Sequence, residues 1–344
     1  MREEILRFSC EGTRMQKDIN ELSVFLLAEG RSLEKENTMA TLILTGEAIT
    51  VDYVKELAEK ISPARALWRP AVEGSVPMAR LENVSPIWVA TVSANLRNRL
   101  DKISCDLNVV HDNMTVTDYK AFVVDMDSTL IAEECMDLLG DLAHVGEQVR
   151  LITQKAMTGK LRFEDSLRQR ANLLVGQPAS ILQECVRFVT LSPGAEYLVK
   201  FFNQYQLETW ILSGGLTEVA QPVVRLLKMN GALANTLEVD ETGCLTGRIY
   251  GPHDQTLFNG ESKRQTVADI CRRLNITPRQ VISAGDGAND VEMVKLSGLG
   301  VAYHPKPLLR SATTFWLNYS GLDTIAAFFM EDWAARADVI EVTF

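Results

Sequence analysis

The chain has 344 residues, of which 46 % are hydrophobic and 23 % are charged, and its formal net charge at pH 7 is −10. The length suits two domains of about 150 residues each, and the composition is that of a globular protein with enough apolar residues for sizeable cores. The acidic balance argues against nucleic acid or an anionic membrane surface as the main partner.

The six cysteines are scattered along the chain, and no pair has the spacing of metal ligands. This distribution is typical of reduced thiols in the cytosol rather than of a disulfide framework. The amino-terminal stretch is charged and lacks the apolar core of a signal peptide, and no apolar run is long enough to span a bilayer. We therefore expect a cytoplasmic protein.

Short apolar runs alternate with helical patterns in the first third of the chain. Strands are expected where apolar residues run together, and helices where they recur every three or four positions. The expected elements are strands over 40–46, 87–93 and 107–110 and helices over 50–61 and 95–104. Together they predict a small α/β domain over residues 1–115.

From residue 120 onwards, three segments share one pattern: AFVVDMD at 121–127, ETWILSGG at 208–215 and QVISAGDG at 280–287. Each begins as an apolar strand, ends in polar residues and precedes a helical pattern. Continuous apolar strands separated by helices predict a parallel sheet covered on both faces. Ligands bind such sheets outside the carboxyl ends of the strands, so we expect one site built from three distant segments.

Residues 136–195 are rich in helical periodicity and poor in strand signals. They predict a helical cap inserted between the first and second strands of the core. The second domain is therefore expected over residues 116–344, as a Rossmann-like α/β core with a parallel sheet and an inserted small cap.

Asp125 and Asp127 lie two residues apart at the end of the first apolar strand. Alternate residues of a strand point the same way, so the two carboxylates would share a face and repel one another. Mg²⁺ relieves such repulsion because it takes hard oxygen ligands. Taken alone, the motif is explained equally well by a polar loop after the strand.

Two further strand ends carry groups of the same kind. Asp286 ends a strand, and Asp290 lies one helical turn beyond it, which suits either a metal site or an Asp/Gly turn with a helix cap. Ser213 and Gly214 precede a helix, where free N–H groups bind phosphate. An ordinary strand-to-helix turn is the alternative for that segment.

Two cations fall on apolar helix stripes. Lys263 is on the inward stripe of its helix, where a lysine needs an anion unless it snorkels to water. Arg170 lies near the face of Phe163, where a guanidinium suits either a carboxylate ligand or an internal salt bridge. Glu133 and Glu134 are adjacent acids after the first motif, and they are either surface charges or the partner of a substrate amine.

Together, DMDST, LSGG, the inward lysine and GDGANDVEM resemble the haloacid dehalogenase superfamily of aspartate-nucleophile phosphotransferases, in the expected order over residues 119–315. The cap segment MTGKLRFEDSLRQR narrows the resemblance to the members that hydrolyse phosphoserine. The resemblance implies Mg²⁺-dependent hydrolysis of O-phospho-L-serine to L-serine and phosphate through an aspartyl-phosphate intermediate, as the last step of serine synthesis.

The resemblance also implies the roles of the site residues. Asp125 would be the nucleophile, and Asp127 the general acid and base. Mg²⁺ would be held by the Asp125 carboxylate, the Asp127 backbone carbonyl and Asp286, and Asp290 would orient metal-bound water. The remaining implied roles are phosphate binding by Ser213, Gly214 and Lys263 with Asn289 nearby, amine binding by Glu134, carboxylate binding by Arg170, and pocket lining by Phe163 and Met157.

Residues 1–115 lie outside the catalytic match. They loosely resemble the regulatory βαβ amino-acid-binding modules, of ferredoxin-like type, that precede some members' catalytic domains, so a homodimer or an amino-acid site is expected there. No nucleic-acid or membrane partner is expected. Two alternatives stay open: a related phosphatase or phosphotransferase for another small phosphomonoester, and a phosphoaspartate switch or sensor whose output is binding.

Overall fold

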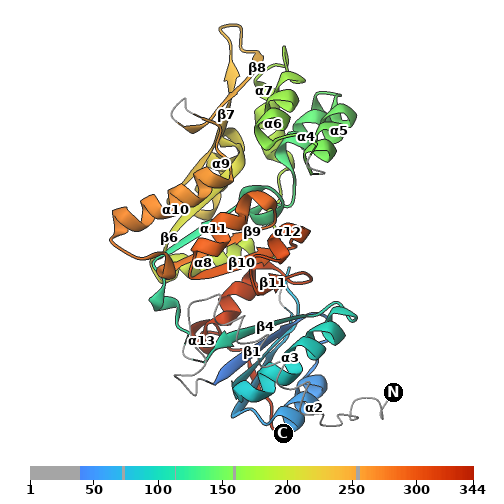
Figure 1. The fold of residues 1–344 in the computed structure, drawn as a ribbon, viewed down its shortest axis with the longest axis vertical. Helices are drawn as coiled ribbons and strands as arrows, with labels where there is room; N and C mark the ends of the chain where they lie inside the picture. The colour runs from blue at the N-terminus through green and yellow to red at the C-terminus, as the bar shows by residue number, and fades with distance from the viewer. Residues whose placement is uncertain (1–38, 72–73, 113, 158–159, 253–255) are drawn as a thin grey trace. The chain divides into compact units, whose positions relative to one another are not determined.

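The structure is a computed structural model, which describes residues 39–71, 74–112, 114–157, 160–252 and 256–344. The chain divides into two compact units (Figure 1). Apart from a short loop around Ser75, the first unit extends to Met114 and also includes Ala337–Phe344, and the second is Thr115–Arg336. The last residues therefore belong with the first unit and not with the catalytic domain expected over 116–344.

In its described residues, the first unit is an antiparallel sheet with two helices. Its elements in chain order are β1 (Ala40–Thr45), α2 (Val51–Ile61), β2 (Arg65–Arg69), β3 (Met78–Val84), α3 (Pro86–Asp101), β4 (Asp106–His111) and β12 (Ile340–Glu341). The strands lie in the order β12-β2-β3-β1-β4. The chain order with β2-β3-β1-β4 pairing is the ferredoxin-like arrangement, as predicted.

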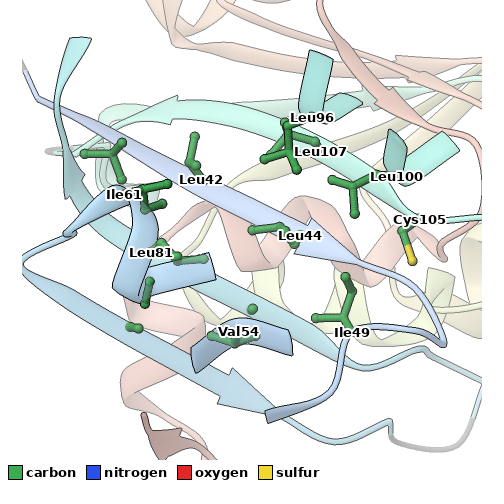
Figure 2. Packing of buried hydrophobic residues seen from close by; sticks show 14 of the residues in the cluster. Leu42, Leu44, Ile49, Val54, Ile61, Leu81, Leu96, Leu100, Cys105 and Leu107 are labelled. Atoms are coloured by element: carbon green, nitrogen blue, oxygen red, sulfur yellow. The ribbon is translucent and has the colours of Figure 1, made fainter. Parts of the chain in front are cut away.

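The core of the first unit lies between the sheet and its helices, as Figure 2 shows. Leu42 and Leu44 alternate along β1 and so point to one face, where they pack with Val54 of α2 and Leu100 of α3. Helix α2 begins at a cap, because the side chain of Thr50 accepts a hydrogen bond from the N–H of Tyr53.

The strand predicted over 87–93 is wrong, because these residues are part of α3. The β-branched residues in IWVATVS favour a strand, but Pro86 at the first helical position is a helix start signal. A short apolar run is not assigned by periodicity alone. The neighbouring strands β2 and β3 were not predicted, because charged residues stand at both ends of β2 and within β3.

The second unit is built on a sheet of mostly parallel strands, as predicted. The strands are β5 (Ala121–Val124), β6 (Glu208–Leu216), β7 (Gly231–Val239), β8 (Leu245–Tyr250), β9 (Val281–Gly285), β10 (Leu299–Tyr303) and β11 (Phe315–Leu317). They lie in the order β11-β10-β9-β5-β6-β7-β8, and only the β7–β8 pair is antiparallel.

Helices cover both faces of this sheet. Val123 of β5 packs in one cluster with Val267 and Met293, which come from the helices on one face. Phe122 points the other way, and its ring lies 4.8 Å from that of Phe202 on the opposite face. The helices of this core are α8 (Ala195–Gln204), α9 (Thr217–Leu227), α10 (Gly260–Leu274), α11 (Val291–Leu296), α12 (Pro307–Arg310) and α13 (Met330–Ala334), with short 3₁₀ turns η1 (Val116–Asp118), η4 (Pro278–Gln280), η5 (Ala288–Asp290) and η6 (Leu322–Phe328).

Between β5 and α8 the described chain forms a group of four helices, which we call the cap (Figure 1). They are α4 (Cys135–Leu142), α5 (Gly146–Met157), α6 (Phe163–Asn172) and α7 (Ser180–Phe188). The loop between α6 and α7 is tied to the β7–β8 hairpin by three main-chain hydrogen bonds, which are Gly176 N–H to Leu245 O (2.9 Å), Leu245 N–H to Gln177 O (2.8 Å) and Ala179 N–H to Gly243 O (2.8 Å).

Among the described helices, none is long and apolar enough to cross a membrane.

Candidate active site

Asp125 follows the central strand directly, and its N–H donates to the carbonyl of Ala284 on β9 at 3.0 Å. The chain then leaves the sheet in a tight turn over η2 (Met126–Leu130), in which Ser128 has a φ of 55°. Asp127 therefore lies in the turn and not in the strand. The strand alternation used to place the two aspartates on one face does not extend this far.

Asp125 belongs to a cluster of buried carboxylates. Oxygen atoms of Asp125, Asp286 and Asp290 all lie within 4.8 Å of one another. Asp125 comes from the end of β5 and the other two from the loop after β9, the strand paired with β5. Parallel pairing thus brings together acids that are about 160 residues apart in the chain.

The loop after β9 is arranged around Asp290. Its carboxylate oxygen Oδ2 accepts the N–H groups of Asp286 (3.2 Å) and Gly287 (3.0 Å). A Cβ on Gly285 would lie 2.3 Å from Cγ of Asp290, so only glycine leaves room for this carboxylate. The first glycine of the GDGAND motif therefore has a packing reason.

Lys263 provides a cation inside the cluster. It lies in the first turn of α10, is 0 % exposed, and places Nζ 2.9 Å from Oδ1 of Asp125 and 2.7 Å from Oδ1 of Asp290. Burial alone would lower the pKa of this lysine, but the two carboxylates raise it. The contacts of Lys263 with Asp125 and Asp290 confirm the prediction that this lysine faces inward towards an anion.

The charges of the cluster are not balanced by Lys263. Burial, followed by the charge of Asp290, raises the pKa of Asp125 well above its usual value. Burial also raises the pKa of Asp286 to about 6, although Lys306 lowers it. Three hard oxygen donors that repel one another when ionised fit a small divalent cation.

Asp127 lies beside the cluster with different partners. Its two carboxylate oxygens accept the N–H and the thiol of Cys135, each at 3.2 Å. Burial and the charge of Glu134 raise the pKa of Asp127 to about 7. A carboxyl group with such a pKa can both give and take a proton near neutral pH.

The end of β6 lies next to Asp127. The hydroxyl of Ser213 is buried and accepts the N–H of Gly215 at 2.9 Å. A Cβ on Gly214 would lie 2.8 Å from Cζ of Phe163 and 3.8 Å from Nδ2 of Asn289. Glycine at 214 thus lets the cap, the β6 loop and the β9 loop approach closely.

Helix α6 of the cap supplies Phe163 and Arg170. Arg170 is only 9 % exposed, and its Nε is buried with no hydrogen-bond partner. Burial lowers the pKa of Arg170, while the charges of Asp137, Glu134 and Asp127 raise it. Met157 ends α5, and its side chain lies outside what the structure describes.

The two adjacent acids after the first motif differ in their surroundings. Glu133 accepts the N–H (2.9 Å) and hydroxyl (2.6 Å) of Thr190, and so joins the two ends of the cap segment. Glu134 instead faces the site, where Oε1 lies 2.9 Å from the hydroxyl of Ser128 and 3.5 Å from Nζ of Lys306. The structure therefore separates a structural acid from one that a ligand can meet.

Sequence reasoning missed two residues of this site, Cys135 and Lys306. The signal for Lys306 is present in the sequence, because the residue follows the apolar strand LGVAY and so falls at the same sheet edge as the three recognised segments. The contact of Cys135 with Asp127 depends on the turn after β5, which no periodicity reveals.

Comparisons with known proteins identify the family of this chain. Residues 119–298 match the model of the haloacid dehalogenase-like hydrolase family. A phosphoserine phosphatase of Polaromonas sp. is 38 % identical over 221 residues, which are 64 % of this chain and 93 % of the relative. That of Saccharomyces cerevisiae is 31 % identical over 293 residues, which are 83 % of this chain and 93 % of the relative.

Solved structures that align with this chain include a hydrolase of the same family and a phosphoserine phosphatase. A HAD family hydrolase from Salmonella enterica serovar Typhi aligns with a TM-score of 0.73 and 29 % identity, over 86 % of this chain and 99 % of that one. A phosphoserine phosphatase solved with a phospho-aspartyl intermediate analogue aligns with a TM-score of 0.57 and 31 % identity, over 61 % of this chain and 99 % of that one. The chain belongs to the haloacid dehalogenase-like hydrolase family.

Proposed function

We propose that this protein hydrolyses O-phospho-L-serine to L-serine and phosphate, the last step of serine synthesis. The observation that carries the substrate is Arg170, a buried guanidinium with an unpaired Nε, in the cap segment that also supplies Glu134. Phosphoserine carries both a carboxylate and an ammonium, which an arginine and a glutamate recognise. The relatives named above as phosphoserine phosphatases support the same substrate.

Asp125 is the proposed nucleophile. Its carboxylate attacks phosphorus, the bond from phosphorus to the serine oxygen breaks, and an aspartyl-phosphate forms. Lys263 offsets the negative charge of the phosphate, and the Ser213 hydroxyl and Gly214 amide hold its oxygens, with Asn289 nearby.

Asp127 is the proposed general acid and base. It donates its proton to the leaving serine oxygen, and then takes a proton from the water that attacks the aspartyl-phosphate and releases phosphate. Its pKa of about 7 suits both steps. Phe163 and Met157 would line the pocket that holds the serine part and excludes water.

The cofactor that we propose is Mg²⁺, held by the side chains of Asp125 and Asp286 and the backbone carbonyl of Asp127, with Asp290 orienting its water. The mutual repulsion of the buried oxygens in this cluster supports the proposal. When bound, the ion supplies positive charge that lowers the repulsion between the phosphate and Asp125.

The proposal is tested by phosphate release from L-phosphoserine with Mg²⁺, with and without a chelator. We expect metal-dependent release by the wild type and none by Asp125→Asn, while Asp269→Asn, an exposed acid of α10, serves as the matched control. No release by the wild type would reject the substrate. A phosphorylated form that persists for minutes with Mg²⁺ would support a phosphoaspartate switch instead.

We also propose a cytoplasmic location and a homodimer formed through the first unit. The described cysteines Cys105, Cys135, Cys185, Cys244 and Cys271 are all free thiols, which suits a reducing compartment. Cell fractionation checks the location, and light scattering of the purified protein checks the dimer. Recovery of the activity from a membrane or extracellular fraction would reject the first proposal, and a monomeric mass the second.

A further inference from the structure

Among the described cations of this site, Lys306 is one that the proposed mechanism does not use. It follows β10, and its Nζ lies 2.8 Å from Oδ2 of Asp286 and 3.5 Å from Oε1 of Glu134. Its own N–H also donates to the carbonyl of Asp286 at 2.8 Å. The main chain and the ammonium are therefore both fixed to Asp286, whereas the contact with Glu134 is the longer one.

Glu134 is the second carboxylate that the Lys306 ammonium contacts. Its Oε1 receives both the Ser128 hydroxyl, at 2.9 Å, and the Lys306 ammonium. The side chains of Glu134 and Lys306 are 40 % and 39 % exposed, so a ligand can reach both of them. If the Lys306 ammonium turns away, the Ser128 hydroxyl still holds Glu134 in place.

We propose that Lys306 is a specificity-determining residue, whose ammonium takes the place of the substrate ammonium on Glu134 when a substrate has none. This inference rests on the proposed function, in which Glu134 binds the amine of phosphoserine. When phosphoserine binds, its ammonium displaces Lys306 from the longer contact, and Lys306 keeps Asp286.

Lys306 affects how strongly the site rejects substrate analogues that lack the amine. A site discriminates against a ligand that lacks a polar group chiefly because its own partner group is left unpaired. Lys306 prevents Glu134 from being left unpaired, so it reduces the penalty for phosphomonoesters that carry no amine. The native enzyme should therefore be less selective for the amine than Glu134 alone would make it.

The test compares L-phosphoserine with 3-phosphooxypropionate, which is the same molecule without the amine. In Lys306→Met, which keeps the stem but removes the charge, the ratio of kcat/KM for the two substrates should rise roughly three- to tenfold. Lys306→Arg keeps the charge and should retain the wild-type ratio. An unchanged or lowered ratio in Lys306→Met would overturn the inference.

Two further measurements separate this role from a general effect of charge. A change in the attraction of all anions, or in metal loading, alters both substrates alike and cancels in the ratio. In Glu134→Gln, the added change Lys306→Met should leave the ratio unchanged, and any shift there contradicts the inference. Equilibrium binding of both compounds to Asp125→Asn, which cannot turn over, should show the same shift in the ratio of dissociation constants.

The outcomes also separate this inference from the proposed function. If Glu134→Gln abolishes the preference for phosphoserine while Lys306→Met leaves the preference unchanged, the role of Glu134 stands and that of Lys306 falls. If the wild type shows no preference for the amine, the role of Glu134 and the inference about Lys306 fall together. Circular dichroism of each variant verifies that it is folded.

Discussion

Burial raises the pKa values of several individual aspartates in this site. Burial raises the pKa of Asp286 to about 6 and that of Asp127 to about 7, whereas an aspartate in the unfolded chain titrates near its ordinary value of about 3.9. In the pH range between these values, the folded protein binds more protons than the unfolded chain. Without metal, the free energy of unfolding should therefore fall as the pH rises through this range.

We predict this slope for the wild type in urea unfolding with a chelator at about pH 5, 6, 7 and 8. Asp127→Asn should flatten the part of the slope nearest pH 7, whereas the exposed Asp269→Asn should keep it. Mg²⁺ should raise the midpoint more at pH 8 than at pH 5, since protons compete with it for carboxylates. Stability that rises with pH throughout would contradict the pKa directions.

A second prediction concerns Lys263, whose ammonium is completely buried between Asp125 and Asp290. Lys263→Met should lower the metal-free free energy of unfolding by about 3–5 kcal/mol, because it leaves buried carboxylates without their cation. Arg272→Met, on the exposed face of the same helix, should change it by less than about 0.5 kcal/mol. Similar values for the two variants in urea titrations would show that Lys263 does not hold the cluster.

At the scale of elements, α6 provides the carboxylate contact proposed for the cap, which is Arg170. Arg170→Ala should lower kcat/KM for phosphoserine on the order of a hundredfold, because charge-assisted hydrogen bonds to the carboxylate are lost. An aryl phosphate without a carboxylate should be affected far less. Arg168→Ala, on the exposed face of α6, is the control and should leave both substrates unchanged; equal losses for both substrates in Arg170→Ala would exclude the carboxylate role.

The sequence predicts an element well where a pattern of neighbouring residues determines it, and poorly where packing against the rest of the fold determines it. The strand ends that carry Asp125, Ser213 and Asp286 follow from apolar runs, and the inward position of Lys263 follows from its helix stripe. The short apolar run over 87–93 predicts a strand but lies in helix α3, and the patterns of β2 and β3 do not predict strands. In both cases the fold of the surrounding unit, not the local pattern, decides the outcome.

In the candidate site, too, local sequence patterns identify residues, whereas the fold decides their contacts. The resemblance gave the residues of four motifs, but the contacts of Glu134 depend on where the turn at Ser128 places it relative to Lys306. The close approach of the Asp290 carboxylate to the oxygens of Asp125 and Asp286 likewise depends on how the β5 and β9 loops pack against each other. Such details arise from distances between segments, which one sequence does not reveal.

At the scale of the whole molecule, every side chain placed in the site comes from Thr115–Arg336. This segment expressed alone should unfold cooperatively and should retain phosphate release from phosphoserine, because it has its own core. If the first unit forms the dimer, the segment should also be monomeric by light scattering. A segment that is folded but inactive would show that the first unit contributes to the chemistry.

The pairing of β12 with β2 also affects how the protein is made. Ile340 and Glu341 lie opposite Trp68 and Leu67, but the ribosome adds them only after all of Thr115–Arg336 has been synthesised. Among the described strands β12 alone flanks β2 on that side, so during this interval the described sheet ends at β2, and sheet edges recruit strands from other chains. Synthesis that stops before Ile340 would therefore leave β2 without β12, and nascent chains should depend on chaperones most until β12 has been made.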